Sequence, residues 1–230
     1  AAGARADAGH VVLPTEAGEL ASGNALYTAL AVHALNALVG SIDTLGGVIV
    51  QRFPELADWP EYTLDAVASQ GETQERLDGA GSQFPLALSA YQNVPERILA
   101  DQPYPLEMLL LLNANPVYDL PNGGRCVEAL MKVPFVVSLA STLDESAAHA
   151  DLILPASTFL EVWGDDYLDG TGYAGISLRR PVVETLHDTR DPGDVLLSLA
   201  QRLGGPLAEA LPWATYQDLI TARLANFDRE

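Results

Sequence analysis

Short apolar runs alternate with helix-like segments between residues 108 and 155, and this alternation constrains the fold more than any other feature of the 230-residue chain. The apolar runs are Met108–Leu112, Phe135–Leu139 and Leu152–Pro155, and helices are expected at about 122–132 and 144–149. Strands that are apolar throughout are typical of a parallel sheet that is buried on both faces. The pattern therefore predicts an α/β fold containing a βαβαβ unit, which is half of a Rossmann-like, doubly wound domain.

The remaining sequence divides into regions of different character. Residues 1–50 are expected to hold an extended leading segment and then a helix that is apolar nearly all round and therefore buried. Residues 51–92 lose all periodicity and are rich in Pro, Gly and acids, which predicts an irregular or disordered insert. Residues 93–155 form the predicted dinucleotide-binding βαβαβ half. Residues 156–230 are expected to hold an acidic loop, an extended segment and two C-terminal helices.

The charge balance excludes several classes of partner. The chain has 31 Asp and Glu against 12 Lys and Arg, which gives a formal net charge of −19. A phosphate backbone would be repelled, so nucleic acid is not an expected partner. The longest apolar stretch, residues 25–40, falls short of the roughly 20 residues that a membrane span needs, so direct membrane insertion is not expected either. At 48% hydrophobic residues the chain can still bury a sizeable core.

Cysteine and histidine usage limits the chemistry that this chain can perform alone. Cys126 is the single cysteine, so an intrachain disulfide, a zinc ribbon or a cysteine-ligated cluster cannot form. Its position in an amphipathic segment predicts a small packed hydrophobe rather than a nucleophile. Neither a G-x-S-x-G elbow nor an H-E-x-x-H pair occurs. No catalytic residue and no metal ligand is therefore assigned.

Polar residues follow the first two predicted strands. The segment Asn113–Asp119 (NANPVYD) follows the first strand, and Ser138–Thr142 closes the second. Open α/β sheets bind ligands at the carboxyl ends of their strands, so this edge favours a nucleotide-like ligand. The segment Gly170–Gly175 spells G-x-G-x-x-G, but an extended segment rather than a helix follows it. It is therefore interpreted as a turn, because the dinucleotide motif needs a helix N-terminus at that point.

Several motifs in order carry a family resemblance. The segment LLLLNANPVYDLPNGGRCVEALMKVPFVVSLASTLDESAAHADLILPASTFLEVWGDD resembles catalytic subunits of the molybdopterin-dependent oxidoreductases of the dimethyl-sulfoxide-reductase family. It is most similar to their polysulfide, thiosulfate and tetrathionate reductase branch. The flanking segments LYTALAVHALNALVGSIDTLGGV and LRRPVVETLHDTRDPGDVLLSLAQRLGG resemble the same family. The resemblance implies that the predicted sheet is part of a molybdopterin oxidoreductase fold.

The resemblance also implies a cofactor and the residues that contact it. The cofactor is bis(molybdopterin guanine dinucleotide) with molybdenum or tungsten, and this chain would line one guanine dinucleotide arm, in several places through backbone groups. The residues that match the family's motifs, and are therefore expected to bind the cofactor, are Ala114, Asn115, Val117, Tyr118, Asp119, Ser138, Leu139, Ser141 and Asp151.

Other parts of the family pattern are not found in these 230 residues. The family's [4Fe–4S] cysteine motif and its metal ligand are absent, so the resemblance implies a middle segment of a longer catalytic polypeptide, inactive when isolated. The parent would perform two-electron redox of a small sulfur- or oxo-compound, together with iron–sulfur and membrane-anchor subunits, in a periplasmic or membrane-associated setting. Two alternatives stay open: a non-catalytic molybdopterin-fold scaffold subunit of a respiratory complex, and a free-standing α/β nucleotide-binding module.

Overall fold

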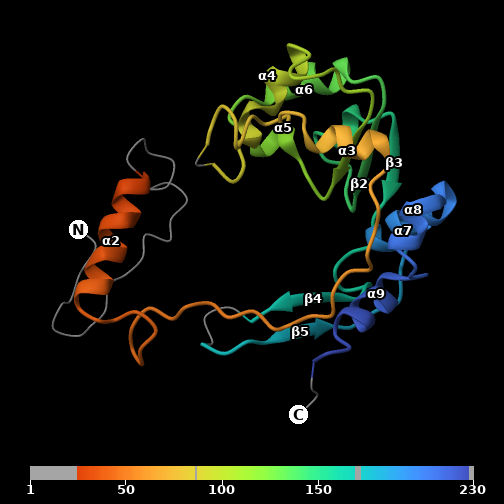
Figure 1. The fold of residues 1–230 in the computed structure, drawn as a ribbon. Coiled ribbons are helices and arrows are strands. Elements are labelled where there is room, and N and C mark those ends of the chain that lie inside the picture. The colour runs from red at the N-terminus through yellow and green to blue at the C-terminus, as the bar shows by residue number, and fades with distance from the viewer. Residues whose placement is uncertain (1–24, 86, 169–171, 228–230) are drawn as a thin grey trace. The chain divides into compact units, whose positions relative to one another are not determined.

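The computed structural model describes residues 25–85, 87–168 and 172–227 (Figure 1). These residues fall into two compact units. One unit takes the chain up to Leu56 together with Asp165–Leu178 and the C-terminal end. The other takes Ala57–Gly164 and Arg179–Asn226, and it contains the predicted sheet.

A parallel three-stranded sheet organises the second unit. Its order is β1 (Leu109–Leu112), β2 (Val136–Ala140) and β3 (Leu152–Pro155), with Leu111 opposite Ser138. The segment from β1 to β2 carries helices α5 (Pro116–Asp119) and α6 (Gly123–Lys132), and the segment from β2 to β3 carries the 3-10 helix η2 (Ala147–His149). The predicted parallel strand order is confirmed, but the helix expected at about 144–149 is only the short 3-10 helix η2.

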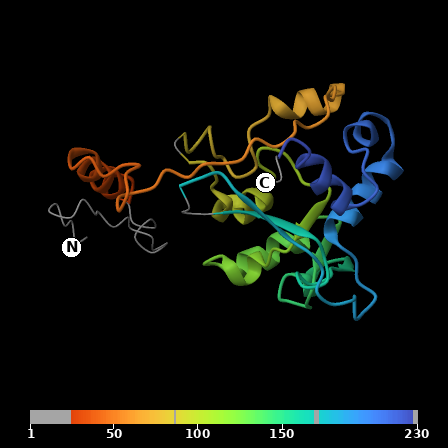
Figure 2. The same ribbon diagram turned by 90° about the horizontal axis from the view of Figure 1, so that it is seen from below.

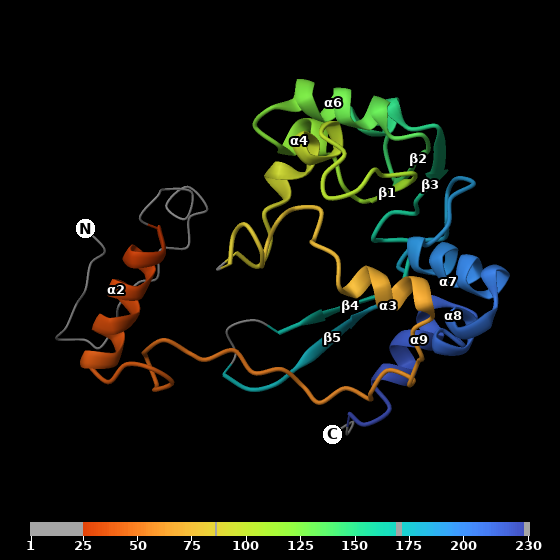
Figure 3. The same ribbon diagram turned by 45° about the horizontal axis from the view of Figure 1, so that its top comes forward.

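Helices α4 (Val94–Leu99) and α6 lie side by side and pack against β1 (Figure 3). Helix α6 is amphipathic because its buried residues Cys126, Ala129 and Leu130 recur at helical spacing. Cys126 is a packed hydrophobe, as predicted. The core cluster consists of Ile98, Leu111, Ala129, Leu130, Val133 and Val136.

Burial of the sheet differs from the prediction. All five residues of β2 are buried, whereas β1 and β3 keep exposed positions such as Leu112 and Ile153. The difference in burial follows from the position of each strand in the sheet. Strand β2 is central and has a hydrogen-bonded neighbour on each side, whereas β1 and β3 are the edge strands of this three-stranded sheet. The all-apolar pattern therefore describes the central strand best.

Three helices, rather than the predicted two, close the second unit: α7 (Pro192–Leu203), α8 (Gly205–Ala210) and α9 (Tyr216–Arg223) (Figure 2). Asp191 caps α7 by accepting a hydrogen bond from the Gly193 N–H at 2.7 Å, as the Asp-Pro signal indicates. The extra helix arises because Gly204, with φ of +72°, ends α7 and a new helix starts directly after it.

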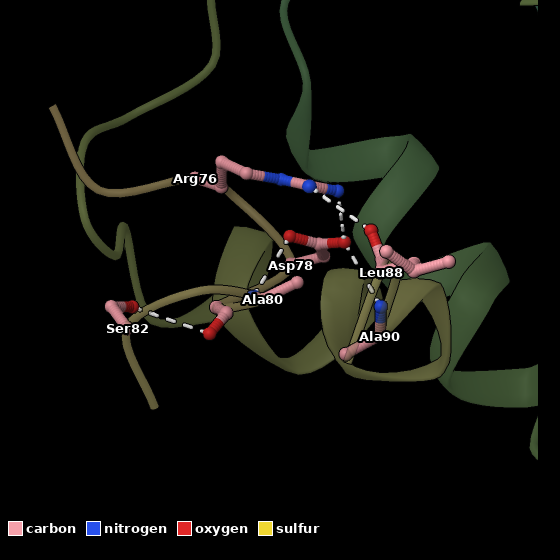
Figure 4. Close-up of polar contacts among 7 residues, drawn as sticks. Arg76, Asp78, Ala80, Ser82, Leu88 and Ala90 are labelled. Carbon is pink, nitrogen blue, oxygen red and sulfur yellow. Dashed lines mark hydrogen bonds and ion pairs between the residues drawn. The ribbon is translucent and has the colours of Figure 1, made fainter. Parts of the chain in front are cut away.

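Part of the 51–92 segment is more ordered than the sequence predicts. It is mainly irregular, with helix α3 (Ala66–Glu72) and the 3-10 helix η1 (Tyr91–Asn93). However, Asp78 is buried, and its carboxylate accepts hydrogen bonds from the Ala80 and Ala90 N–H groups at 3.1 and 2.9 Å (Figure 4). Arg76 pairs with the same carboxylate at 2.8 Å. These contacts, rather than apolar periodicity, tie together the two ends of the loop from residue 78 to residue 90.

The first unit contains helix α2 (Ala25–Leu38), which the sequence predicts to be buried. Within the described residues it is largely exposed: Val32 and Asn36 are buried, while Leu38 is 82% exposed. The prediction of burial is therefore wrong for the described chain, because few described residues of this unit pack on the helix. Asn36 is buried and its side chain accepts a hydrogen bond from the Ser41 hydroxyl at 2.9 Å, whereas His33 is exposed.

The G-x-G-x-x-G segment lies between two strands, β4 (Gly164–Tyr167) and β5 (Ile176–Arg179), which pair as a two-stranded sheet. Its first glycine, Gly170, lies outside the described residues. A strand rather than a helix follows Gly175, so the interpretation as a turn is confirmed for the described part. In the part of the chain that the structure describes, no helix has the length and apolar character that crossing a bilayer requires.

Candidate functional site

The Asn-Pro loop begins where β1 leaves the sheet. Asn113 has a φ of +47°, in the left-handed region that Asn tolerates better than most residues, and its N–H donates to the Leu139 carbonyl at 3.1 Å. Pro116 then opens α5, where its fixed φ suits the first helical position. The loop is therefore held at one end by the sheet and at the other by a helix start.

The Asn115 side chain connects this loop to the loop that follows β2. Its Oδ1 accepts hydrogen bonds from the Ser146 hydroxyl at 2.7 Å and from the Ser146 N–H at 3.2 Å. Its Nδ2 donates to Oε2 of Glu145 at 2.7 Å. The Ser146 hydroxyl also accepts from the Val117 N–H at 3.0 Å, and Ser146 is fully buried. We call these four residues, Asn115, Val117, Glu145 and Ser146, the loop brace.

Several predicted site residues come together at this carboxyl edge. Ala114 is exposed two residues beyond β1 and Ser141 is exposed directly beyond β2. The last residue of β1, Leu112, pairs with Leu139 of β2. Tyr118 and Asp119 are exposed on α5, and their N–H groups donate to the Asn115 carbonyl at 3.0 and 2.9 Å. Together with Val117 and Asn115 in the brace, these residues form one small polar surface at the strand ends.

Other predicted residues lie elsewhere. Ser138 and Leu139 are each 1% exposed inside β2, so their side chains belong to the core and cannot reach a ligand at the edge. Asp151 precedes β3, and its carboxylate accepts from the Val136 N–H at 2.7 Å. Because the strands are parallel, this position is at the amino edge of the sheet, opposite the Asn-Pro loop. The structure therefore does not bring Asp151 together with the others.

Two residues that matter to this edge, Glu145 and Ser146, were missed by sequence reasoning. The acid pair Asp144-Glu145 precedes a predicted helix, where acidic side chains ordinarily interact with the helix dipole. The burial of Ser146 has no signal in the sequence. The hydrogen bond from the Asn115 amide lowers the pKa of the Glu145 carboxyl. Burial raises the pKa of the Cys126 thiol, and Cys126 lines a largely apolar cavity of about 460 Å³ beneath α4 and α6.

The acidic loop that follows β3 contains a carboxylate with structural contacts. Glu161 is half-buried, and its carboxylate accepts from the Leu186 N–H at 2.9 Å and the Thr158 N–H at 2.7 Å. These donors, Leu186 first, lower the pKa of Glu161. Glu161 therefore holds two segments of the chain together.

Over the described residues, no group of three or more His, Cys, Asp or Glu side chains is arranged to hold a metal ion.

Comparison with known proteins gives relatives along most of the chain. The arsenate respiratory reductase molybdopterin-containing subunit of Shewanella sp. (strain ANA-3) is 32% identical over 219 residues, covering 90% of this chain and 26% of that protein. The thiosulfate reductase molybdopterin-containing subunit of Salmonella typhimurium is 28% identical over 207 residues, covering 84% and 26%. The menaquinone reductase molybdopterin-binding-like subunit of Nitratidesulfovibrio vulgaris is 41% identical over 126 residues, covering 53% and 18%.

The fold comparison agrees with the sequence relatives. Acetylene hydratase from Pelobacter acetylenicus matches with a TM-score of 0.51 and 25% sequence identity, covering 60% of this chain and 19% of that one. The chain spans about a quarter or less of the length of these proteins. The family described as molybdopterin oxidoreductase matches residues 17–202. With this match over most of its length, the chain belongs to the molybdopterin oxidoreductase family.

Proposed function

We propose that this chain holds one guanine dinucleotide arm of a bis(molybdopterin guanine dinucleotide) cofactor, with molybdenum or tungsten, in a longer catalytic subunit. The observation that carries the proposal is the loop brace, which ties the two loops at the carboxyl edge of the sheet together through hydrogen bonds of their own side chains. A pre-organised edge of this kind lowers the entropy cost of ordering loops around a ligand.

The residues at this edge fit a dinucleotide. Ala114 and Ser141 have small side chains that leave the backbone accessible, and Asp119 offers a carboxylate to the N–H groups of a purine. Helix α6 starts with Gly123 and Gly124, carries no acid in its first turn, and its cap residue makes no side-chain hydrogen bond. Its first N–H groups therefore suit a pyrophosphate, which helix N-termini attract.

When bound, the cofactor supplies the metal at which an oxo or sulfur group and two electrons are exchanged. The residues of this chain bind and orient the dinucleotide at the end of that cofactor. The proposed substrate is a small sulfur or arsenic oxyanion, which follows from the names of the relatives. Iron–sulfur and membrane-anchor partners, and a periplasmic or membrane-associated setting, are proposed on the family resemblance.

A second candidate is a non-catalytic scaffold subunit with the same fold. It is favoured by the 41% identity to a subunit that is described as molybdopterin-binding-like. The two candidates differ in one measurable property: the full-length enzyme would carry metal and guanine nucleotide, and a scaffold would carry neither.

The test measures cofactor in the full-length protein. We expect purified wild type to release two guanine nucleotides per metal ion after acid hydrolysis, and Asn115→Ala to lower both metal and nucleotide per protein. Asn226→Ala is the matched control, because Asn226 is an exposed asparagine outside the edge. A folded wild type without metal or nucleotide, prepared from a cell that makes the cofactor, would favour the scaffold. Wild-type cofactor content in Asn115→Ala would remove this residue from the site.

A further inference from the structure

The orientation of the Asn115 amide is determined by the chemistry of its neighbours. A backbone N–H can only donate, so the Ser146 N–H at 3.2 Å identifies the oxygen of the amide. A carboxylate can only accept, so Glu145 at 2.7 Å identifies the nitrogen. The two neighbours make the same assignment independently, and reversing the amide would place acceptor against acceptor and donor against donor.

Counting donors and acceptors then shows what the amide still offers. Its oxygen has two lone pairs, and the hydroxyl and the N–H of Ser146 occupy both. Its nitrogen carries two hydrogens, and within the described residues one of them is donated to Glu145. The one group left for a ligand is therefore an N–H donor.

We propose that Glu145 and Ser146 are positioning residues of the cofactor site, which hold Asn115 as a hydrogen-bond donor toward an oxygen acceptor of the dinucleotide. A phosphate, a ribose hydroxyl and the guanine carbonyl all provide such an acceptor. The inference rests on the proposed function and adds two residues to it. Ser146 acts from a fully buried position and also accepts from Val117, so the same hydroxyl fixes the backbone of the Asn-Pro loop.

A purely structural brace is the competing explanation, and an exchange of the two side-chain types separates it from the proposal. In the double variant Asn115→Asp/Glu145→Gln, the new amide at 145 donates to the new carboxylate at 115, and the second carboxylate oxygen still accepts from Ser146. The net charge and the brace are preserved. The N–H that position 115 offered to a ligand is replaced by a lone pair.

The experiment uses the full-length protein purified with its cofactor. We expect the double variant to keep the wild-type hydrogen-exchange protection of the Val117 amide but to bind the cofactor about 10- to 100-fold more weakly, measured as guanine nucleotide retained during dialysis. The double variant Asn226→Asp/Glu209→Gln makes the same chemical exchange at two exposed positions and controls for it. Wild-type retention in the Asn115→Asp/Glu145→Gln protein would overturn the donor role and leave a brace alone.

Single variants test each positioning residue. Glu145→Gln can still accept from Asn115 through its carbonyl oxygen, so it should retain more cofactor than Glu145→Ala. Equal loss in both would overturn the role of Glu145 as an acceptor that orients the amide. Ser146→Ala should expose the Val117 amide to exchange and lower retention together, and retention without protection would overturn the role of Ser146. A wild type that contains no cofactor would overturn the proposed function itself, while the Val117 protection would still report the brace.

Discussion

Gly123, the first residue of α6, should not tolerate a side chain, whereas its neighbour Gly124 should. A Cβ on Gly123 would lie under 3.0 Å from the carbonyl oxygen of Val117, a backbone atom that cannot rotate away. Overpacking of this kind costs about 1–3 kcal/mol. A Cβ on Gly124 would meet nothing closer than Oδ1 of Asn122 at 4.0 Å, and Gly→Ala at a compatible position stabilises by about 0.4–1 kcal/mol. The two alanine variants should therefore change stability in opposite directions.

Amide hydrogen exchange of α6 measures this difference locally. The free energies of opening in Gly123→Ala and Gly124→Ala should differ by about 1.4–4 kcal/mol, which makes α6 amides exchange at least about tenfold faster in the first variant. Because Val117 is also part of the loop brace, its own amide should lose protection in Gly123→Ala alone. Equal exchange in the two variants, or the reverse order, would refute the close contact between α6 and the Asn-Pro loop.

Two further predictions concern stability. Leu139 and Leu112 are register partners, but Leu139 is 1% exposed and Leu112 is 43% exposed. In urea unfolding followed by hydrogen exchange of the sheet, Leu139→Ala should therefore destabilise the sheet by about 2–5 kcal/mol and Leu112→Ala by about 1 kcal/mol. Equal losses of stability in the two variants would contradict the central position of β2. The Ala90 N–H, more than any other group, lowers the pKa of Asp78. A carboxyl group whose pKa is lower in the folded state stabilises the fold at pH values above its unfolded pKa, about 3.9 for Asp. This stabilisation is lost as the pH falls through the pKa of the folded state. Hydrogen-exchange protection of the Ala80 and Ala90 amides should therefore be constant from about pH 5 to 8 and should decrease below about pH 4. In Asp78→Asn this protection should already be lost at about pH 7. Protection of the wild type that persists at about pH 2 would contradict the prediction.

The sheet and its helices were predictable because their signal is periodic and local. Apolar runs of strand length and the helical spacing of Cys126, Ala129 and Leu130 are readable in a single window of sequence. The loop from Asp78 to Ala90 was not predictable, because a carboxylate that accepts from a backbone N–H twelve residues along the chain leaves no periodic trace. The exposure of α2 was missed for a related reason, since an apolar helix indicates what it needs to pack against but not where that partner is.

The candidate site shows the same division. The position of the Asn-Pro loop at the carboxyl edge was predictable because the loop directly follows an apolar run of strand length in a parallel α/β pattern. Ser146 was missed because a serine after a strand resembles any capping residue until its burial and its contacts with Asn115 are known. Asp151 was grouped with the site by motif alone, although its place immediately before β3 assigns it to the amino edge once the strands are known to be parallel.

The bridge between Ala156 and Arg190 has a consequence for how this part of the chain can vary. Ser157 donates from its N–H to the Arg190 carbonyl at 2.9 Å, and its hydroxyl lies 2.9 Å from that of Thr189, so the excursion between these residues begins and ends at one point beside β3. Loop closure costs little more free energy as such a segment lengthens, since the cost grows only with the logarithm of its length. Insertions and deletions within residues 158–188 should therefore accumulate among relatives without disturbing the register of the sheet or the Asn-Pro loop.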